Sequence, residues 1–207
     1  MSEHYYSKKT NAKSDERTWS FLLRGTSLTF TTDHAVFSKG EVDFGSRLLI
    51  ETFEVPVVDG DLLDLGCGYG PIGLSLAKDL SERHVWLVDV NERALELSRK
   101  NAVQNQLENV SIKESDRFSS IKENQFAAIL TNPPIRAGKR TVHAMFEDAH
   151  EALVDQGELW VVIQKKQGAP SAKEKLKEWF GNVEVIVKQK GYYILKAKKF
   201  DRSIDLC

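Results

Sequence analysis

The stretch Asp64-Leu65-Gly66-Cys67-Gly68-Tyr69-Gly70, residues 64–70, decides the fold of this chain. It ends a short apolar run and precedes a helical pattern that begins at Pro71, a favourable first position for a helix. Glycines allow the backbone to approach a ligand, and a helix N-terminus supplies unpaired N–H donors. A glycine-rich turn between strand and helix therefore predicts a binding loop for a nucleoside-type ligand in an α/β sheet.

The charge of this loop separates three classes of nucleotide site. A dinucleotide fingerprint needs a third glycine where Pro71 stands, and a phosphate loop needs a Lys-Ser or Lys-Thr pair that the stretch lacks. Asp64 would repel a pyrophosphate, but it can pair with the ammonium group of a methionine-like moiety. The loop therefore favours S-adenosylmethionine as the cofactor.

Short apolar runs continue outward from this loop and predict the rest of an α/β fold. Five are expected as strands with helices in the gaps between them, at residues 62–65, 85–88, 110–112, 127–130 and 159–163. Such alternation is typical of a Rossmann-like, mostly parallel sheet. The runs at 183–187 and 192–195 are too close together for a crossover helix, so they should form a C-terminal antiparallel hairpin and complete seven strands.

The chain of 207 residues is long enough for one substantial core. A strand at residues 27–32 and a helix at 44–53 predict an N-terminal extension at 1–55 that packs on the core. The cofactor-binding domain is expected at 56–200 and a tail at 201–207.

Composition leaves the partner open but narrows the location. The net charge is -1, no run of 18 apolar residues occurs, and the two cysteines lack the spacing of a disulfide framework or a zinc site. We therefore expect a cytoplasmic protein without a membrane segment or a metal. Lysines are frequent in the last quarter, but acids are interspersed among them, so an ordinary solvated surface is the expectation there.

A second polar loop, Asn132-Pro133-Pro134-Ile135, follows the fourth predicted strand at the edge where open α/β sheets place their ligands. Prolines lack N–H donors and fix φ, so this loop should present acceptors in a stiff frame. The Asn132 Oδ1 and the Pro133 carbonyl are expected to accept the hydrogens of an amine and orient it toward the methyl donor. A plain turn at the end of the strand is the structural alternative.

Residues 64–70 resemble the first motif of class I S-adenosylmethionine-dependent methyltransferases. The resemblance implies that ten residues contact the cofactor. They are Asp64, Gly66, Cys67, Gly68, Gly70, Asp89, Val90, Ser115, Asp116 and Asn132. By the same resemblance, Asp89 accepts both ribose hydroxyls, and Asp116 accepts from the adenine amine. The family usually has an aromatic residue after the second proline, where this chain has Ile135, so Phe37 or Phe146 is expected to supply the ring that stacks on the substrate.

Residues 35–43 and 132–139 are similar to the ribosomal RNA guanine-N2 methyltransferase family typified by RsmC. The similarity implies an RNA substrate, and the protein is expected to act as a monomer or a homodimer. The substrate would then be contacted by Phe37, Arg136, Lys139 and Arg140. The three cations would face RNA phosphates, and the alternative is that they form a solvated loop.

Two other functions fit parts of this pattern. Glutamine methyltransferases that act on release factors share an Asn-Pro-Pro motif, although Tyr follows it where this chain has Ile135. A non-catalytic RNA-binding or ribosome-assembly protein could retain the cofactor fold, but it would have no need of Asp64, Asp89 and Asn132.

Overall fold

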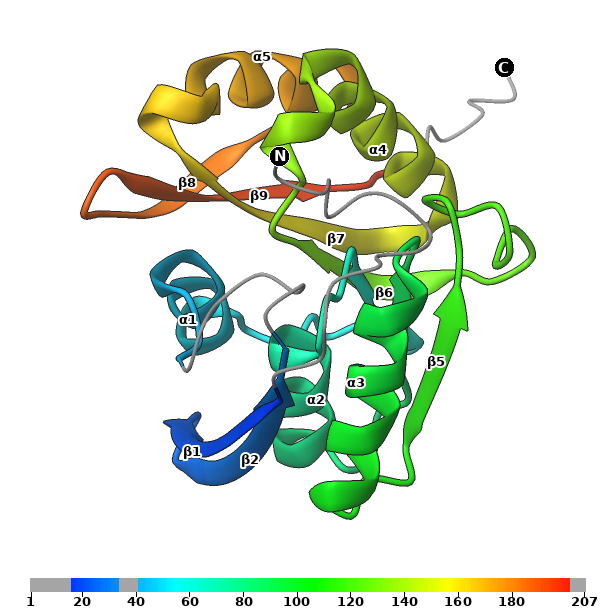
Figure 1. Ribbon diagram of the computed structural model, residues 1–207. Coiled ribbons are helices and arrows are strands. Elements are labelled where there is room, and N and C mark those ends of the chain that lie inside the picture. The colour runs from blue at the N-terminus through cyan, green and yellow to red at the C-terminus, as the bar shows by residue number, and fades with distance from the viewer. Residues whose placement is uncertain (1–15, 34–40, 202–207) are drawn as a thin grey trace.

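A computed structural model describes residues 16–33 and 41–201, and shows a seven-stranded sheet with helices on both faces (Figure 1). The strand order is β5-β4-β3-β6-β7-β9-β8. The strands are β3 (Asp61–Leu65), β4 (Val85–Asp89), β5 (Val110–Glu114), β6 (Phe126–Thr131), β7 (Leu153–Gln164), β8 (Glu184–Gln189) and β9 (Tyr192–Lys198). β3 to β7 run parallel, whereas β9 pairs antiparallel with both β7 and β8. The predicted Rossmann-like sheet with its C-terminal hairpin is confirmed.

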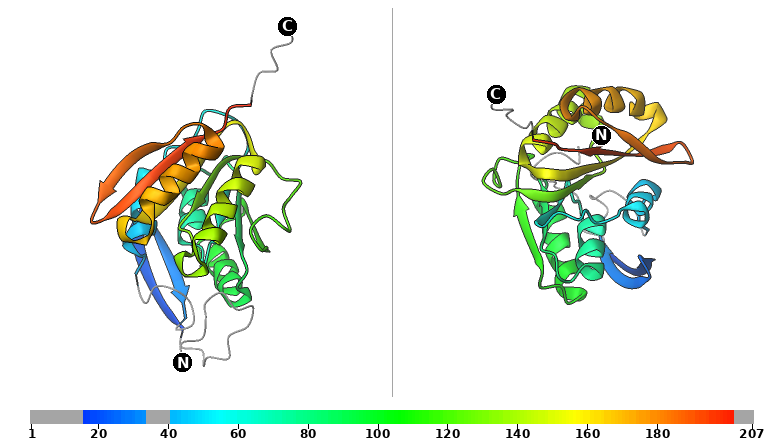
Figure 2. Two further views of the ribbon diagram at one scale, coloured as in Figure 1. Left: turned by 90° about the horizontal axis from the view of Figure 1, so that it is seen from above. Right: turned by 180° about the vertical axis from the view of Figure 1, so that it is seen from behind.

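Five α-helices of the described residues cover the sheet in two layers with separate cores (Figure 2). The helices are α1 (Phe44–Thr52), α2 (Pro71–Asp79), α3 (Glu92–Gln104), α4 (Lys139–Ala152) and α5 (Ala169–Phe180). The first three pack with Leu62, Leu87 and Leu130, whereas α4 and α5 pack with the alternate strand residues, such as Leu63 and Ile129. Successive strand side chains point to opposite faces, so each strand contributes to both cores.

An N-terminal hairpin of β1 (Arg17–Leu23) and β2 (Thr26–Thr32) packs beside α2 and α3. The sequence analysis predicted β2 but missed β1. The sequence offered only Gly25 as a turn signal, whereas the structure shows that Arg24 and Gly25 both adopt positive φ, 48° and 75°, as a two-residue hairpin turn requires. Asn101 of α3 attaches the hairpin by accepting from the Thr31 N–H at 2.7 Å.

The expectation of a helix in every gap between parallel strands was wrong for residues 115–125, which connect β5 to β6 through turns alone. Serine side chains occupy the local backbone groups there. Ser115 Oγ donates to the Arg117 carbonyl and accepts from the Ser120 N–H, and Ser119 Oγ accepts from the Asp116 N–H. Such bonds compete with the helical pattern, so this connection stays irregular.

The topology brings several loops to one edge of the sheet. Paired registers place the carboxyl ends of β3, β4, β5 and β6 side by side. Tyr192 at the start of β9 pairs with Gln164 at the end of β7, so the β8–β9 turn lies at the same edge. Within the described residues, no helix is long and apolar enough to cross a membrane.

Candidate active site

The glycine-rich turn follows β3 and is held against the end of β4. The N–H groups of Gly66 and Cys67 both donate to the Val88 carbonyl, at 2.9 and 3.0 Å. Gly66 is exposed with a φ of 80°, and a Cβ built on it would meet no atom within 4 Å. Gly70 has a φ of 94°, and a Cβ there would come within 2.7 Å of Ser98 Oγ. Gly66 therefore borders open space at the edge of the sheet, whereas Gly70 is required by internal packing.

Asp64 lies beneath this turn and is 1% exposed. Its Oδ2 accepts from the Gly73 N–H at 2.7 Å, while its buried Oδ1 has no hydrogen-bond partner among the described residues. Burial raises the pKa of Asp64 to about 7; the Gly73 N–H acts in the opposite direction, and the charge of Asp89 raises it further. A buried acceptor without a donor is costly in a protein interior, and a cationic group would compensate for it.

Asp89 ends β4 and joins the turn to the start of α3. Its Oδ2 accepts from the Gly68 N–H and its Oδ1 from the Asn91 N–H, each at 2.9 Å. Burial raises the pKa of Asp89, against the lowering effect of the N–H groups of Asn91, Gly68 and Val90. A carboxylate has about four lone-pair sites, so both oxygens can still accept a further bond. Asp89 thus orders the loop and keeps acceptor capacity.

Cys67 is a buried part of the turn. Its Sγ lies 3.8 Å from Ser98 Oγ and 3.5 Å from the Gly68 carbonyl. Burial, with the nearby charges of Asp89 and Asp64, raises the pKa of the Cys67 thiol well above its ordinary value. The thiol is therefore neutral and forms part of the wall of the loop.

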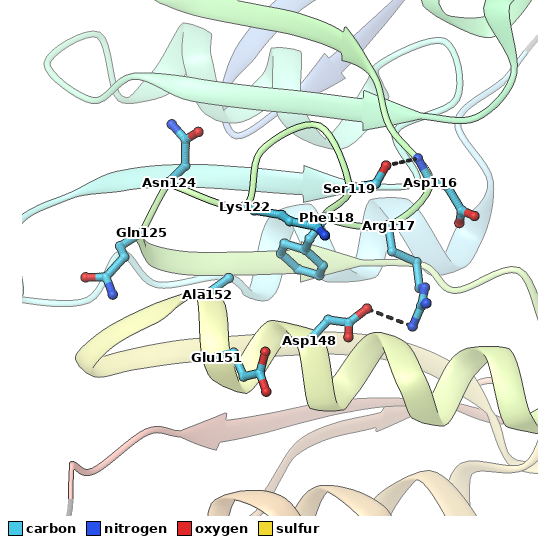
Figure 3. A pocket seen from close by; sticks show the side chains of 10 residues that line it. All are labelled: Asp116, Arg117, Phe118, Ser119, Lys122, Asn124, Gln125, Asp148, Glu151 and Ala152. Atoms are coloured by element: carbon cyan, nitrogen blue, oxygen red, sulfur yellow. Dashed lines mark hydrogen bonds and ion pairs between the residues drawn. The ribbon is translucent and has the colours of Figure 1, made fainter.

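Ser115 and Asp116 follow β5 beside the end of β4, where the Ser115 N–H donates to the Asp89 carbonyl at 3.0 Å. Asp116 is exposed and lines a cavity of about 480 Å³ between the 115–125 connection and α4 (Figure 3). An ion pair of 2.8 Å between Arg117 and Asp148 joins its two sides. Among the predicted site residues that the structure describes, Asp116 alone lines this cavity.

Asn132 follows β6, and its amide group has a defined orientation. Its Nδ2 donates to Asp43 Oδ1 at 3.3 Å and to Ser46 Oγ at 3.1 Å. The same Asp43 oxygen accepts from the Ser46 N–H at 3.0 Å and caps α1. An ionised carboxylate only accepts, so Asp43 requires the NH₂ side of the amide and turns the Asn132 carbonyl oxygen away from itself. That oxygen has no hydrogen-bond donor within the described part of the chain.

The remaining residues of the loop differ in exposure. Pro133 is buried, Ile135 is half-buried against the core beneath α4, and Arg136, Lys139 and Arg140 are exposed at the start of that helix. Phe146, one of two candidates for a stacking ring, is fully buried in that core, so the interpretation was wrong for this residue. The other candidate, Phe37, lies outside the described residues.

The structure connects the two loops and adds residues to which the sequence analysis assigned no role. Thr131 Oγ1 donates to the Leu65 carbonyl at 2.8 Å, which ties the Asn132 loop to the glycine-rich turn. Asp43 and Ser46 orient Asn132 across 89 and 86 positions of sequence. A helix-capping pattern at Asp43 was visible in the sequence, but its second bond depends on tertiary packing.

These observations fit the cofactor that the glycine-rich turn predicts. The exposed backbone at Gly66 provides space for a ligand, and the unpaired Asp64 Oδ1 matches an ammonium group. The Asp89 carboxylate retains acceptor capacity for paired hydroxyls.

The family model of the methyltransferase small domain matches residues 27–196. The chain belongs to this family. It is an S-adenosylmethionine-dependent methyltransferase of class I and of the RsmC-like group.

Two relatives show what this methyltransferase small domain is similar to in sequence. YbxB of Bacillus subtilis (strain 168), described as uncharacterized, is 64% identical over 200 residues, which cover 96% of this chain and 100% of YbxB. Ribosomal RNA small subunit methyltransferase C of Actinobacillus pleuropneumoniae serotype 7 is 36% identical over 169 residues, or 79% of this chain and 50% of that enzyme. The chain thus spans about half the length of the named ribosomal RNA methyltransferases that it matches.

A solved structure with a similar fold has ligands bound. It is the 16S ribosomal RNA N2 G1207 methyltransferase RsmC of T. thermophilus, in complex with AdoMet and guanosine. The TM-score is 0.79 at 28% identity, covering 89% of this chain and 50% of that one.

Proposed function

We propose that this methyltransferase transfers a methyl group from S-adenosylmethionine to the exocyclic N2 of a guanine in small-subunit ribosomal RNA. The observation that carries the proposal is the orientation of Asn132. Its Nδ2 is bonded to Asp43 and Ser46, so its Oδ1 is left as an acceptor at the edge of the sheet. An acceptor at this position suits a group that brings hydrogens, as an amine does.

The proposed roles of the residues follow from their bonds. Asp64 would pair with the ammonium group of the cofactor, Gly66 would allow its close approach, and Asp89 would accept from its ribose hydroxyls. The contacts of Val90, Ser115 and Asp116 are proposed on resemblance to the class I family. The cofactor supplies an electrophilic methyl group when it is bound.

Asn132 would act by positioning the nucleophile. The lone pair of an exocyclic amine is delocalised into the base, so the amine reacts slowly unless it is held in line with the methyl carbon. Asn132 Oδ1 and the Pro133 carbonyl would each accept one amine hydrogen. The amine nitrogen would form a bond to the methyl carbon as the bond from that carbon to the cofactor sulfur breaks, and the methylated nitrogen would then lose one proton to solvent.

The choice of guanine in ribosomal RNA is supported by the relatives. The relative from Actinobacillus pleuropneumoniae is named a small-subunit ribosomal RNA methyltransferase, and the T. thermophilus enzyme is in complex with both AdoMet and guanosine. A glutamine side chain presents similar N–H groups, so a release factor is the main competing substrate. Arg136, Lys139 and Arg140 would contact RNA phosphates, since all three are exposed beside the Asn132 loop.

Transfer of labelled methyl groups tests this proposal. Small ribosomal subunits, free ribosomal RNA and release factors from a strain lacking the protein would be incubated with native enzyme and with Asn132→Ala. We expect label in RNA with the native enzyme and none with the variant. Label confined to release factors would move the activity to glutamine, and cofactor binding without label in either would contradict both substrates.

A further inference from the structure

Aromatic rings and cations gather where the N-terminal half of α1 meets the β8–β9 turn. Phe44 and Tyr192 pack with ring centroids 5.5 Å apart. The Arg47 Cζ lies 5.4 Å from the Phe44 centroid, and the Lys190 Nζ lies 4.8 Å from it. We call these four residues, Phe44, Arg47, Lys190 and Tyr192, the α1–hairpin surface. Phe44, Arg47 and Tyr192 are half-buried, and Lys190 is exposed.

The α1–hairpin surface adjoins the residues that orient Asn132. Phe44 and Ser46 both lie in the first turn of α1, which Asp43 caps. A Cβ on the intervening Gly45 would lie 2.8 Å from Tyr192 Cε1, so helix and hairpin are in close contact there. Figure 1 shows α1 beside the β8–β9 hairpin, and in Figure 2 the turn of the hairpin projects beyond the remaining strands. The surface thus adjoins, within the first turn of α1, the residues that orient Asn132.

The cations of this surface are among the described cations that form no ion pair. Arg47 and Lys190 take part in no ion pair within the described residues, whereas Lys175, Lys196 and Lys199 each pair with an acid. The nearby Asp43 is engaged with α1 and Asn132. Positive charge is therefore available here for an anionic partner.

We infer that the α1–hairpin surface binds a single-stranded stretch of RNA next to the target nucleotide. Single strands are bound where cations follow the phosphates and aromatic side chains stack on unpaired bases. Arg47 and Lys190 supply the cations, and Phe44 and Tyr192 supply the rings. The inference rests on the proposed RNA substrate and assigns a binding role to part of the lysine-rich end, for which an ordinary solvated surface was expected.

Binding of a labelled single-stranded RNA, measured by fluorescence anisotropy over a salt series, tests the inference without any need for methyl transfer. The test variant is Arg47→Gln/Lys190→Gln. The matched control is Lys188→Gln/Lys198→Gln, whose lysines lie over the rings of Tyr193 and Phe200, at 4.9 and 5.7 Å. Tyr193 packs with the core beneath α4 and α5, on the face opposite Tyr192.

Counterion release gives the expected size of the effect. Each phosphate contact on a single strand contributes about 0.7 to the salt slope, which is about fivefold in affinity near 0.1 M salt. The test variant should bind roughly 25-fold more weakly with a slope about 1.4 units shallower, and the control should bind within about twofold of the native protein. Equal weakening in both variants, or no change in the test variant, would overturn the inference, as would tighter binding of duplex RNA.

Methyl transfer by the same proteins separates this inference from the proposed function. If the test variant loses RNA affinity but even the native enzyme methylates no RNA, the binding surface stands and the proposed substrate fails. If RNA is methylated and the test variant binds RNA as the native protein does, the surface is wrong and the proposed function stands. Thermal unfolding of each variant verifies that the fold is retained.

Discussion

Replacing Asp43 by serine should separate the positioning of Asn132 from the stability of α1. Asp43 Oδ1 both caps the helix through the Ser46 N–H, at 3.0 Å, and accepts from Asn132 Nδ2, at 3.3 Å. Serine caps a helix about as well as aspartate but is too short and too weakly polar to replace the second bond. Ser46 Oγ, the other partner of the amide, is a hydroxyl that can donate or accept, so it does not select the orientation.

The size of the loss follows from the lost bond. A hydrogen bond to a charged group contributes roughly 1.5–3 kcal/mol, and the 3.3 Å distance places this one at the low end. About 1.5 kcal/mol corresponds to about a tenfold fall in kcat/KM for methyl transfer. Asp43→Ala removes the cap as well, so it should lose the same activity and also about 1 kcal/mol of stability, or roughly 2–4 °C in Tm for a chain of this size.

Steady-state methyl transfer, thermal unfolding and calorimetric titration with the cofactor measure the three quantities. The reasoning requires Asp43→Ser to lose activity at native Tm and native cofactor affinity. Native activity in Asp43→Ser, or a fall in activity that follows Tm through both variants, would refute the positioning role.

Three further changes concern the cofactor loop. Gly66→Ala should abolish cofactor binding at a cost of only about 1–2 kcal/mol in stability, since its Cβ meets no protein atom. Gly70→Ala should destabilise the fold more because its Cβ meets Ser98. Equal cofactor affinity in calorimetry and equal Tm for the two variants would contradict this. Asp64, with a pKa of about 7, should release close to one proton when a cationic cofactor binds near pH 6, and titrations in buffers of different ionisation enthalpy would refute the pairing if Asp64→Asn released the same number. Asp89→Ala should weaken cofactor binding by about 1.5–3 kcal/mol, and unchanged affinity in calorimetry would remove its ribose role.

The same buried acid predicts a pH dependence of stability. Folding raises the pKa of Asp64 from 3.8 to about 7, so the folded state binds more protons than the unfolded state between these values. Its contribution to the free energy of unfolding is therefore fully favourable at low pH and is lost as pH rises from about 4 to about 7. Unfolding of the native protein and Asp64→Asn without cofactor should differ in slope across this window, and parallel profiles would contradict the assignment.

Local patterns were sufficient to predict most of the sheet. Parallel strands buried on both faces read as continuous apolar runs, so β3, β4 and β6 were visible without tertiary information. β1 was missed because Arg24-Gly25 is not a typical hairpin-turn pair in sequence. The helix expected in the gap at residues 115–125 was replaced by serine-stabilised turns. Hydrogen bonds from side chains to the backbone determine the conformation of residues 115–125, and the spacing of hydrophobic residues does not reveal such bonds.

Some parts of the candidate site could be predicted from the sequence, whereas others depend on tertiary packing. The turn at residues 64–70 and Asn132 are placed by motif, because backbone conformation and strand order determine their positions. The bond from Asp43 to Asn132 spans 89 positions, and the pairing of Phe44 with Tyr192 depends on how α1 meets β9. Phe146 was misjudged for a related reason, since a sequence does not show which aromatic residue is buried in the core.

The chemical identity of the methylated nucleoside tests the central claim most directly. Small-subunit RNA from a strain lacking the protein would be methylated in vitro, digested to nucleosides and separated with mass-spectrometric detection. The account predicts N2-methylguanosine with the native enzyme and its absence with Asn132→Ala, a variant that still binds the cofactor. A methyl group on a ring nitrogen, a carbon or a ribose, or equal methylation by Asn132→Ala, would contradict it.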